Sequence, residues 1–208
     1  MATEIEIKLG VPDRETLERV LKDPGLTQYM KDDYEVREMH STYFDTEDGQ
    51  LSKRMWTLRL RDEGGQKVAA FKTANTSDSA GVFTRGEWQC VIDSIEDAVP
   101  MLIDQGAPAE LKKVLKGKHL IPTCGAQFQR RSACLFLEDG VRVEMAGDIG
   151  YLYAGDRREP ICELELELLY GNVGSLPPLC SQLMEDYGLR EEQRSKYQRA
   201  KALREAEA

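Results

Sequence analysis

The most constraining feature of this sequence is a segment near its start in which charged and apolar side chains alternate. In Glu4-Ile5-Glu6-Ile7-Lys8, two carboxylates and an ammonium group occupy every second position. Successive residues of a β-strand point to opposite faces, so these three charges share one face and the isoleucines the other. One such strand fits either the solvated face of an antiparallel sheet or a metal-and-phosphate site built on a strand.

Later segments repeat this alternation, and most of them carry one sign of charge. Acidic side chains recur at every second position of the segment 163–167. Basic side chains recur at Arg59 and Arg61, at Lys72, and at Arg130 and Arg131, whereas Arg85, Glu87 and Gln89 share one face of a mixed strand. A solvated face usually mixes signs, so the separation of acids from bases by strand favours a functional site.

Turn residues and side-chain periodicity outline the secondary structure. They predict strands at 4–8, 35–46, 55–61, 67–72, 83–91, 126–137, 141–148 and 160–169. They predict helices at 14–22 with Asp13 as N-cap, at 94–106, at 108–117, at 177–187 and from about 191 onward. Residues 73–81 are expected to form a loop, and residues 204–208 are expected to fray.

The charged faces of these strands must contact solvent or line a polar interior. Their opposite faces carry Ile, Leu, Val, Phe and Trp, which must be buried. A closed barrel with a charged interior and an apolar exterior covered by helices meets both requirements and leaves no edge strand. We therefore predict an α+β, mainly β fold in which a closed barrel has helices packed outside.

The two signs of charge indicate what such an interior would bind. Clustered carboxylates repel one another unless a cation neutralises them, and Mg²⁺ or Mn²⁺ prefers oxygen ligands. Several Arg and Lys side chains that face one cavity suit a polyanion, because guanidinium groups grip phosphate oxygens in pairs. Carboxylates, a divalent metal and a basic cradle together indicate a triphosphate site and phosphoryl-transfer chemistry.

Composition limits the remaining possibilities. The 208 residues fit one domain, 41% apolar and 31% charged, without an apolar run approaching the roughly 20 residues of a membrane helix. Without such a run, no membrane partner is expected. A net charge of −9 disfavours nonspecific nucleic-acid binding, so no nucleic-acid partner is expected either. Five scattered cysteines and only two histidines argue against a zinc site and favour reduced thiols in the cytoplasm.

In order along the chain, these motifs resemble the CYTH superfamily of triphosphate tunnel metalloenzymes. The first segment resembles the E-x-E-x-K signature of this family. The other matching segments are Tyr43-Phe44-Asp45-Thr46, Leu58-Arg59-Leu60-Arg61, Phe71-Lys72-Thr73, Arg85-x-Glu87, Arg131, Glu144-x-x-x-Asp148, Cys162-Glu163-Leu164-Glu165-Leu166-Glu167-Leu168 and Ser195-Lys196. The resemblance covers nearly the whole chain.

The resemblance implies a single domain over 1–208, C-terminal helices at about 177–208 included, built as an eight-stranded antiparallel tunnel. One or two Mg²⁺ or Mn²⁺ ions would be bound by Glu4, Glu6, Glu163 and Glu165. The phosphates would be held by Lys8, Arg59, Arg61, Lys72, Arg85, Arg131 and Lys196. The candidate catalytic groups are Lys8, together with Glu87, Glu144 and Asp148, which would orient the bases or assist with metal and water. A lysine and a metal-bound hydroxide both remain open as the acceptor of the proton of the attacking water.

Four positions depart from the family pattern or have more than one interpretation. Gln129 stands where some members carry a lysine, and strand parity predicts that Arg130 points outward. Glu167 is expected at the rim, in solvent. Tyr43 fits the core and the tunnel lining equally.

The implied activity is metal-dependent hydrolysis of a small anionic triphosphate. The acidic strand at 162–168 and the short C-terminal helices favour inorganic tripolyphosphate as the substrate. The alternatives are a thiamine triphosphatase, a class IV adenylate cyclase, and a noncatalytic module that binds polyphosphate or nucleotide. Pure phosphate binding does not require four clustered glutamates, which argues against the noncatalytic module.

Overall fold

The computed structural model describes residues 2–74, 76–77 and 83–205, and strands dominate them. The strands are β1 (Ala2–Gly10), β2 (Glu35–Thr46), β3 (Thr57–Glu63), β4 (Gln66–Lys72), β5 (Thr76–Ser77), β6 (Phe83–Val91), β7 (Leu120–Phe136), β8 (Arg142–Ala154), β9 (Arg157–Tyr170) and β10 (Arg190–Glu191). The α-helices are α1 (Arg14–Leu21), α2 (Pro24–Thr27), α3 (Ala98–Asp104), α4 (Glu110–Leu115), α5 (Leu176–Tyr187) and α6 (Lys196–Glu205). No helix in these ranges is long and apolar enough to cross a membrane.

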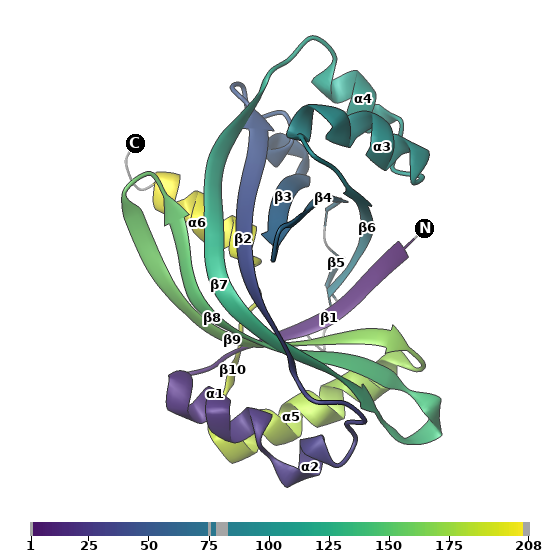
Figure 1. Cartoon of the computed structure of the whole chain (residues 1–208), viewed down its shortest axis with the longest axis vertical. Helices are drawn as coiled ribbons and strands as arrows, with labels where there is room; N and C mark the ends of the chain where they lie inside the picture. The colour runs from purple at the N-terminus through teal and green to yellow at the C-terminus, as the bar shows by residue number, and fades with distance from the viewer. Residues whose placement is uncertain (1, 75, 78–82, 206–208) are drawn as a thin grey trace.

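Eight of the strands close into a barrel, because β1 pairs with both β9 and β6 (Figure 1). Around the barrel the order is β1, β9, β8, β7, β2, β3, β4 and β6, and each neighbouring pair is antiparallel. The short strands β10 and β5 extend the sheet beside β1 and β6. The predicted closed eight-stranded antiparallel barrel is therefore confirmed.

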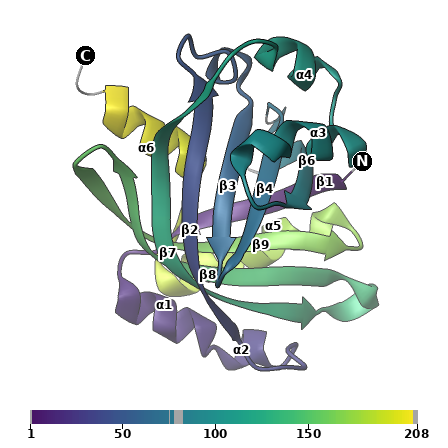
Figure 2. The ribbon, with the colours of Figure 1, turned by 45° about the horizontal axis from the view of Figure 1, so that its top comes forward.

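Two groups of helices cover the outside of this barrel. Helices α1, α2 and α5 lie together beneath β8 and β9 (Figure 1), where they bury the apolar faces of β1, β8 and β9. The side chain of Asp13 caps α1 as predicted, since it accepts a hydrogen bond of 2.7 Å from the backbone N–H of Thr16. Helices α3 and α4 lie over β4 and β6 (Figure 2), where they enclose a core that includes Phe71 and Trp88.

Helix α6 differs, because it packs against the inner faces of the barrel strands. Its Tyr197 and Ala200 belong to a core with Phe128 of β7, Leu152 of β8 and Ile161 of β9. Alternation along β9 places Ile161 on the same face as Glu163 and Glu165, which is the face toward the interior. Figures 1 and 2 show α6 within the bend of β7 and β8. Helix α6 therefore fills part of one end of the barrel.

Some predicted boundaries shift. Strand β7 begins at Leu120 instead of 126, because Pro122 and Gly125 interrupt the strand pattern although β2 still pairs with this segment across a register shift. Helix α6 begins at Lys196 instead of about 191, since residues 190–191 pair with β1 as β10. Of the predicted loop 73–81, residues 75 and 78–81 lie outside the described residues, as do 206–208 of the predicted frayed end.

Candidate active site

A cavity of about 280 Å³ lies inside the barrel, and its lining is mostly charged. The predicted site residues that line it are Glu4, Glu6, Lys8, Arg59, Arg61, Lys72, Arg85, Glu87, Glu144, Glu165 and Lys196. Those that do not line it are Arg131, Asp148 and Glu163. The predicted site residues that line this cavity thus come from seven elements, β1, β3, β4, β6, β8, β9 and α6.

Two buried arginines of β3, Arg59 and Arg61, form one wall of the cavity with little negative charge beside them. Arg61 lies 3.4 Å from Glu63. Arg59 is only 8% exposed, and it makes no hydrogen bond or ion pair with any residue that the structure describes. The Nε of Arg61 donates to the hydroxyl of Ser41 at 3.0 Å. Burial, together with the positive charges of Arg59 and Arg130, lowers the pKa of Arg61 to about 10. A buried, unpaired guanidinium beside other cations is costly unless an anion joins it.

Next to β3 in the barrel, strands β4, β6 and β1 carry charges that are paired with one another. The ammonium of Lys72 lies 2.7 Å from Glu4 and 2.9 Å from Glu87. Arg85 contacts Glu4 closely and lies 3.4 Å from Glu6. Although burial alone would raise the pKa of Glu4, Lys72 and Arg85 hold it well below its usual range. Both bases are thereby fixed in orientation toward the cavity.

Three glutamates lie side by side on neighbouring strands in an acidic row. Glu144 of β8 is paired in register with Glu167 of β9, which is paired in turn with Glu6 of β1. Neither Glu144 nor Glu167 has a hydrogen bond or ion pair within the described part of the chain. Burial, together with the carboxylates of Glu4 and Glu6, raises the pKa of Glu167 to about 8. The expectation that Glu167 lies at the rim is wrong, since it lines the cavity beside Glu6.

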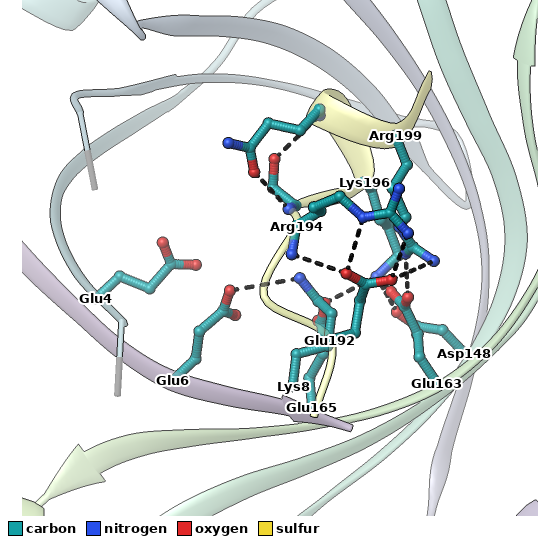
Figure 3. A network of polar contacts seen from close by, with 12 residues as sticks. Glu4, Glu6, Lys8, Asp148, Glu163, Glu165, Glu192, Arg194, Lys196 and Arg199 are labelled. Carbon is teal, nitrogen blue, oxygen red and sulfur yellow. Dashed lines mark hydrogen bonds and ion pairs between the residues drawn. The ribbon is translucent and has the colours of Figure 1, made fainter. Parts of the chain in front are cut away.

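A second carboxylate group lies toward α6 and is neutralised by cations from the chain itself. Asp148, Glu163 and Glu165 each place an oxygen within 4.8 Å of the other two. The ammonium of Lys196 lies 2.7 Å from Asp148 and 2.8 Å from Glu165, and it also contacts Glu163 (Figure 3). Lys8 lies 3.4 Å from Glu165, at the edge of this group.

Two arginines complete this second group, and the sequence analysis misplaced one and missed the other. Arg130 donates two parallel hydrogen bonds to Asp148, at 2.8 and 2.7 Å, and lines the cavity instead of pointing outward. Arg199 pairs with Glu163 (Figure 3). It lies three residues after Lys196 in α6, so helical spacing places both side chains on one face. This spacing could have identified Arg199 from the sequence.

Arg131 requires a correction. The structure places it on the outer face of β7, where it pairs with Glu18 of α1 and lies over the ring of Tyr34. It shares this face with Leu135, which is buried in the core under α1 and α2. Because side chains alternate along a strand, the inward position belongs to Arg130. A phosphate-binding role for Arg131 does not fit this placement.

Comparison with known proteins agrees with this geometry. The CYTH domain family matches residues 2–200. The chain is 28% identical over 180 residues to an inorganic triphosphatase of Haemophilus influenzae, a match that spans 85% of this chain and 48% of the relative. The chain therefore spans about half the length of this curated relative.

Solved structures share the fold at low sequence identity. A putative adenylyl cyclase from Hippeastrum, described as having a dominant triphosphatase activity, is similar with a TM-score of 0.65 and 18% identity, over 97% of this chain and 96% of that chain. A putative adenylate cyclase of Bacillus halodurans is similar with a TM-score of 0.51 and 16% identity, over 94% and 96% of the two chains. With the family match over nearly its whole length, the chain belongs to the CYTH domain family.

Proposed function

We propose that the barrel binds a triphosphate and hydrolyses its terminal phosphoanhydride with the help of a divalent cation. The observation that carries this proposal is the buried arginine wall, in which Arg59 has no partner in the described structure and neighbouring cations lower the pKa of Arg61. A polyanion inside the cavity would supply the missing negative charge. The similarity to an inorganic triphosphatase supports the same class of substrate.

The acidic row fits a divalent metal. Glu144 and Glu167 make no hydrogen bond or ion pair in the described structure and lie in register beside Glu6. They offer the oxygen ligands that Mg²⁺ and Mn²⁺ prefer. Of the four ligands proposed from sequence, Glu6 fits this site best, and Glu4 and Glu165 flank it. Glu163 is 1% exposed and paired with Lys196 and Arg199, so Glu167 replaces it in the proposed set. A bound metal would neutralise charge on the phosphate oxygens.

The side chains of this chain would then position the substrate. Arg59, Arg61 and Arg130 line the cavity, where their guanidinium groups can hold phosphate oxygens. Lys8, Lys72 and Arg85 reach the cavity from β1, β4 and β6, and Glu4 and Glu87 keep the last two in orientation. Phosphoryl transfer depends mainly on positioning and on neutralisation of charge, and this arrangement supplies both.

We propose inorganic tripolyphosphate as the substrate and a reducing compartment such as the cytoplasm as the location. The aromatic residues that line the cavity are Tyr43 and Tyr197, and both are buried with their ring centroids 5.2 Å apart. Because each ring is buried and packs against the other, we propose that neither stacks on a nucleobase or a thiamine ring. All five cysteines are free thiols, which suits a reducing compartment.

The test is phosphate release from tripolyphosphate, with ATP and thiamine triphosphate measured in parallel. We expect release with Mg²⁺ or Mn²⁺, loss of release with a chelator, and a preference for tripolyphosphate over both organic triphosphates. The variant Glu6→Ala should bind tripolyphosphate and release at least about 100-fold less phosphate, because one metal-binding carboxylate is gone. Wild-type protein that binds tripolyphosphate but releases nothing with either metal would show a noncatalytic binding module instead.

A further inference from the structure

We infer that Lys196 acts as a built-in cation, which occupies the carboxylate cluster of Asp148, Glu163 and Glu165 and limits the protein to one divalent ion. That ion would bind at the acidic row of Glu6, Glu144 and Glu167. The inference rests on the proposed function, because it concerns the metal of the same cavity.

The geometry of the cluster is that of a cation site already filled. Its three carboxylates place oxygens within 4.8 Å of one another, a spacing that one central ion could bridge. The ammonium of Lys196 takes that central place, at 2.7 Å from Asp148 and 2.8 Å from Glu165 and in contact with Glu163. Lys196 is itself buried, with its ammonium in contact with all three carboxylates.

The charges of the cluster balance without a metal. Its three carboxylates face Lys196, Arg130 and Arg199, and Glu165 also lies 3.4 Å from Lys8. A divalent ion would therefore bring two unbalanced positive charges into a buried place and displace an ammonium from its partners. The acidic row is the opposite case, because Glu144 and Glu167 make no hydrogen bond or ion pair with the described residues.

Arg199 is the positioning residue in this arrangement. It holds Glu163 from the side of α6, and its Nε is buried without a hydrogen-bond partner in the described structure, so Glu163 is its main anion. Tyr197 and Ala200, on the same helix, are buried against the inner faces of β7, β8 and β9. The packing of α6 therefore fixes the position of the Lys196 ammonium group among the carboxylates (Figure 3).

The test counts bound Mn²⁺ without any substrate, by titration calorimetry and by the spin-resonance signal of free Mn²⁺. We expect one Mn²⁺ per wild-type chain and two per chain for Lys196→Ala, since removal of the ammonium opens a second three-carboxylate site. In the double variant Lys196→Ala with Glu163→Gln, the count should return to one. The matched control is Lys201→Ala, an exposed lysine of the same helix that pairs with Glu205, and it should bind one.

If Lys196→Ala does not fold, the same count is made on Lys196→Met, which keeps the side-chain volume. Circular dichroism shows whether each variant is folded. Two Mn²⁺ ions on the wild type, or a single ion on both folded Lys196 variants, would overturn the inference. The count does not depend on hydrolysis. One ion on the wild type without phosphate release would refute the proposed function and leave the inference standing. Two ions on the wild type with phosphate release would refute the inference and leave the proposed function standing.

Discussion

Replacement of Arg59 by methionine is expected to lower kcat/KM for tripolyphosphate by about 100-fold and yet to raise the stability of the fold. Hydrogen bonds to charged groups contribute about 1.5–3 kcal/mol, and about 1.4 kcal/mol corresponds to a factor of ten. In the absence of substrate the same guanidinium is buried, unpaired and close to Arg61, so methionine removes a repulsive charge. We expect the free energy of unfolding to rise by about 1 kcal/mol.

Steady-state phosphate release and urea unfolding, measured on the same preparation, check both effects. The control is Arg14→Met, an exposed arginine at the start of α1, which should change neither quantity. If Arg59→Met destabilises the protein as well as reducing activity, the arginine has a structural partner and its role as an unpaired anion binder is refuted.

Replacement of Asp148 by asparagine is expected to destabilise the fold by about 3–5 kcal/mol, because it removes one partner of a buried ion-pair network. Asp148 is 0% exposed and receives hydrogen bonds from Arg130 at 2.8 and 2.7 Å and from Lys196 at 2.7 Å. Asparagine keeps the shape of the side chain but not its charge, so two buried cations lose part of their balance. The loss should appear in urea unfolding at neutral pH.

The matched control for this variant is Glu138→Gln, which neutralises an exposed carboxylate in the turn before β8 and should stay within about 0.5 kcal/mol of wild type. A loss below about 1 kcal/mol for Asp148→Asn would mean that water or the remaining carboxylates compensate the cations. In that case Asp148 would not be the structural anchor of Arg130.

The alternation of charged and apolar residues is sufficient to predict the barrel. The apolar face of each strand must be buried against helices, and the charged faces, separated by sign, must then line a shared interior. The motif at Glu4, Glu6 and Lys8 lies in the cavity for this reason. The role of Asp13 as N-cap of α1 is also predictable from sequence, because an N-cap depends only on the residues that follow it.

The features that sequence reasoning misplaced depend on contacts between segments distant in the chain. The adjacent pair Arg130 and Arg131 has no local feature that decides which points inward, and only the packing of Leu135 beneath α1 and α2 decides it. Glu167 is interior because β9 continues in register with β1 as far as Glu6, which the length of one strand does not reveal. Arg199 reaches Glu163 only because α6 turns into the barrel.

The most direct test of the account is a crystal structure with tripolyphosphate in the absence of divalent metal, where no turnover is expected. The account predicts the phosphate chain inside the barrel, within hydrogen-bond distance of Arg59 and of at least one of Arg61 and Arg130. Tripolyphosphate bound only on the outer surface, or a cavity in which Arg59 remains without an anion at saturating ligand, would contradict it.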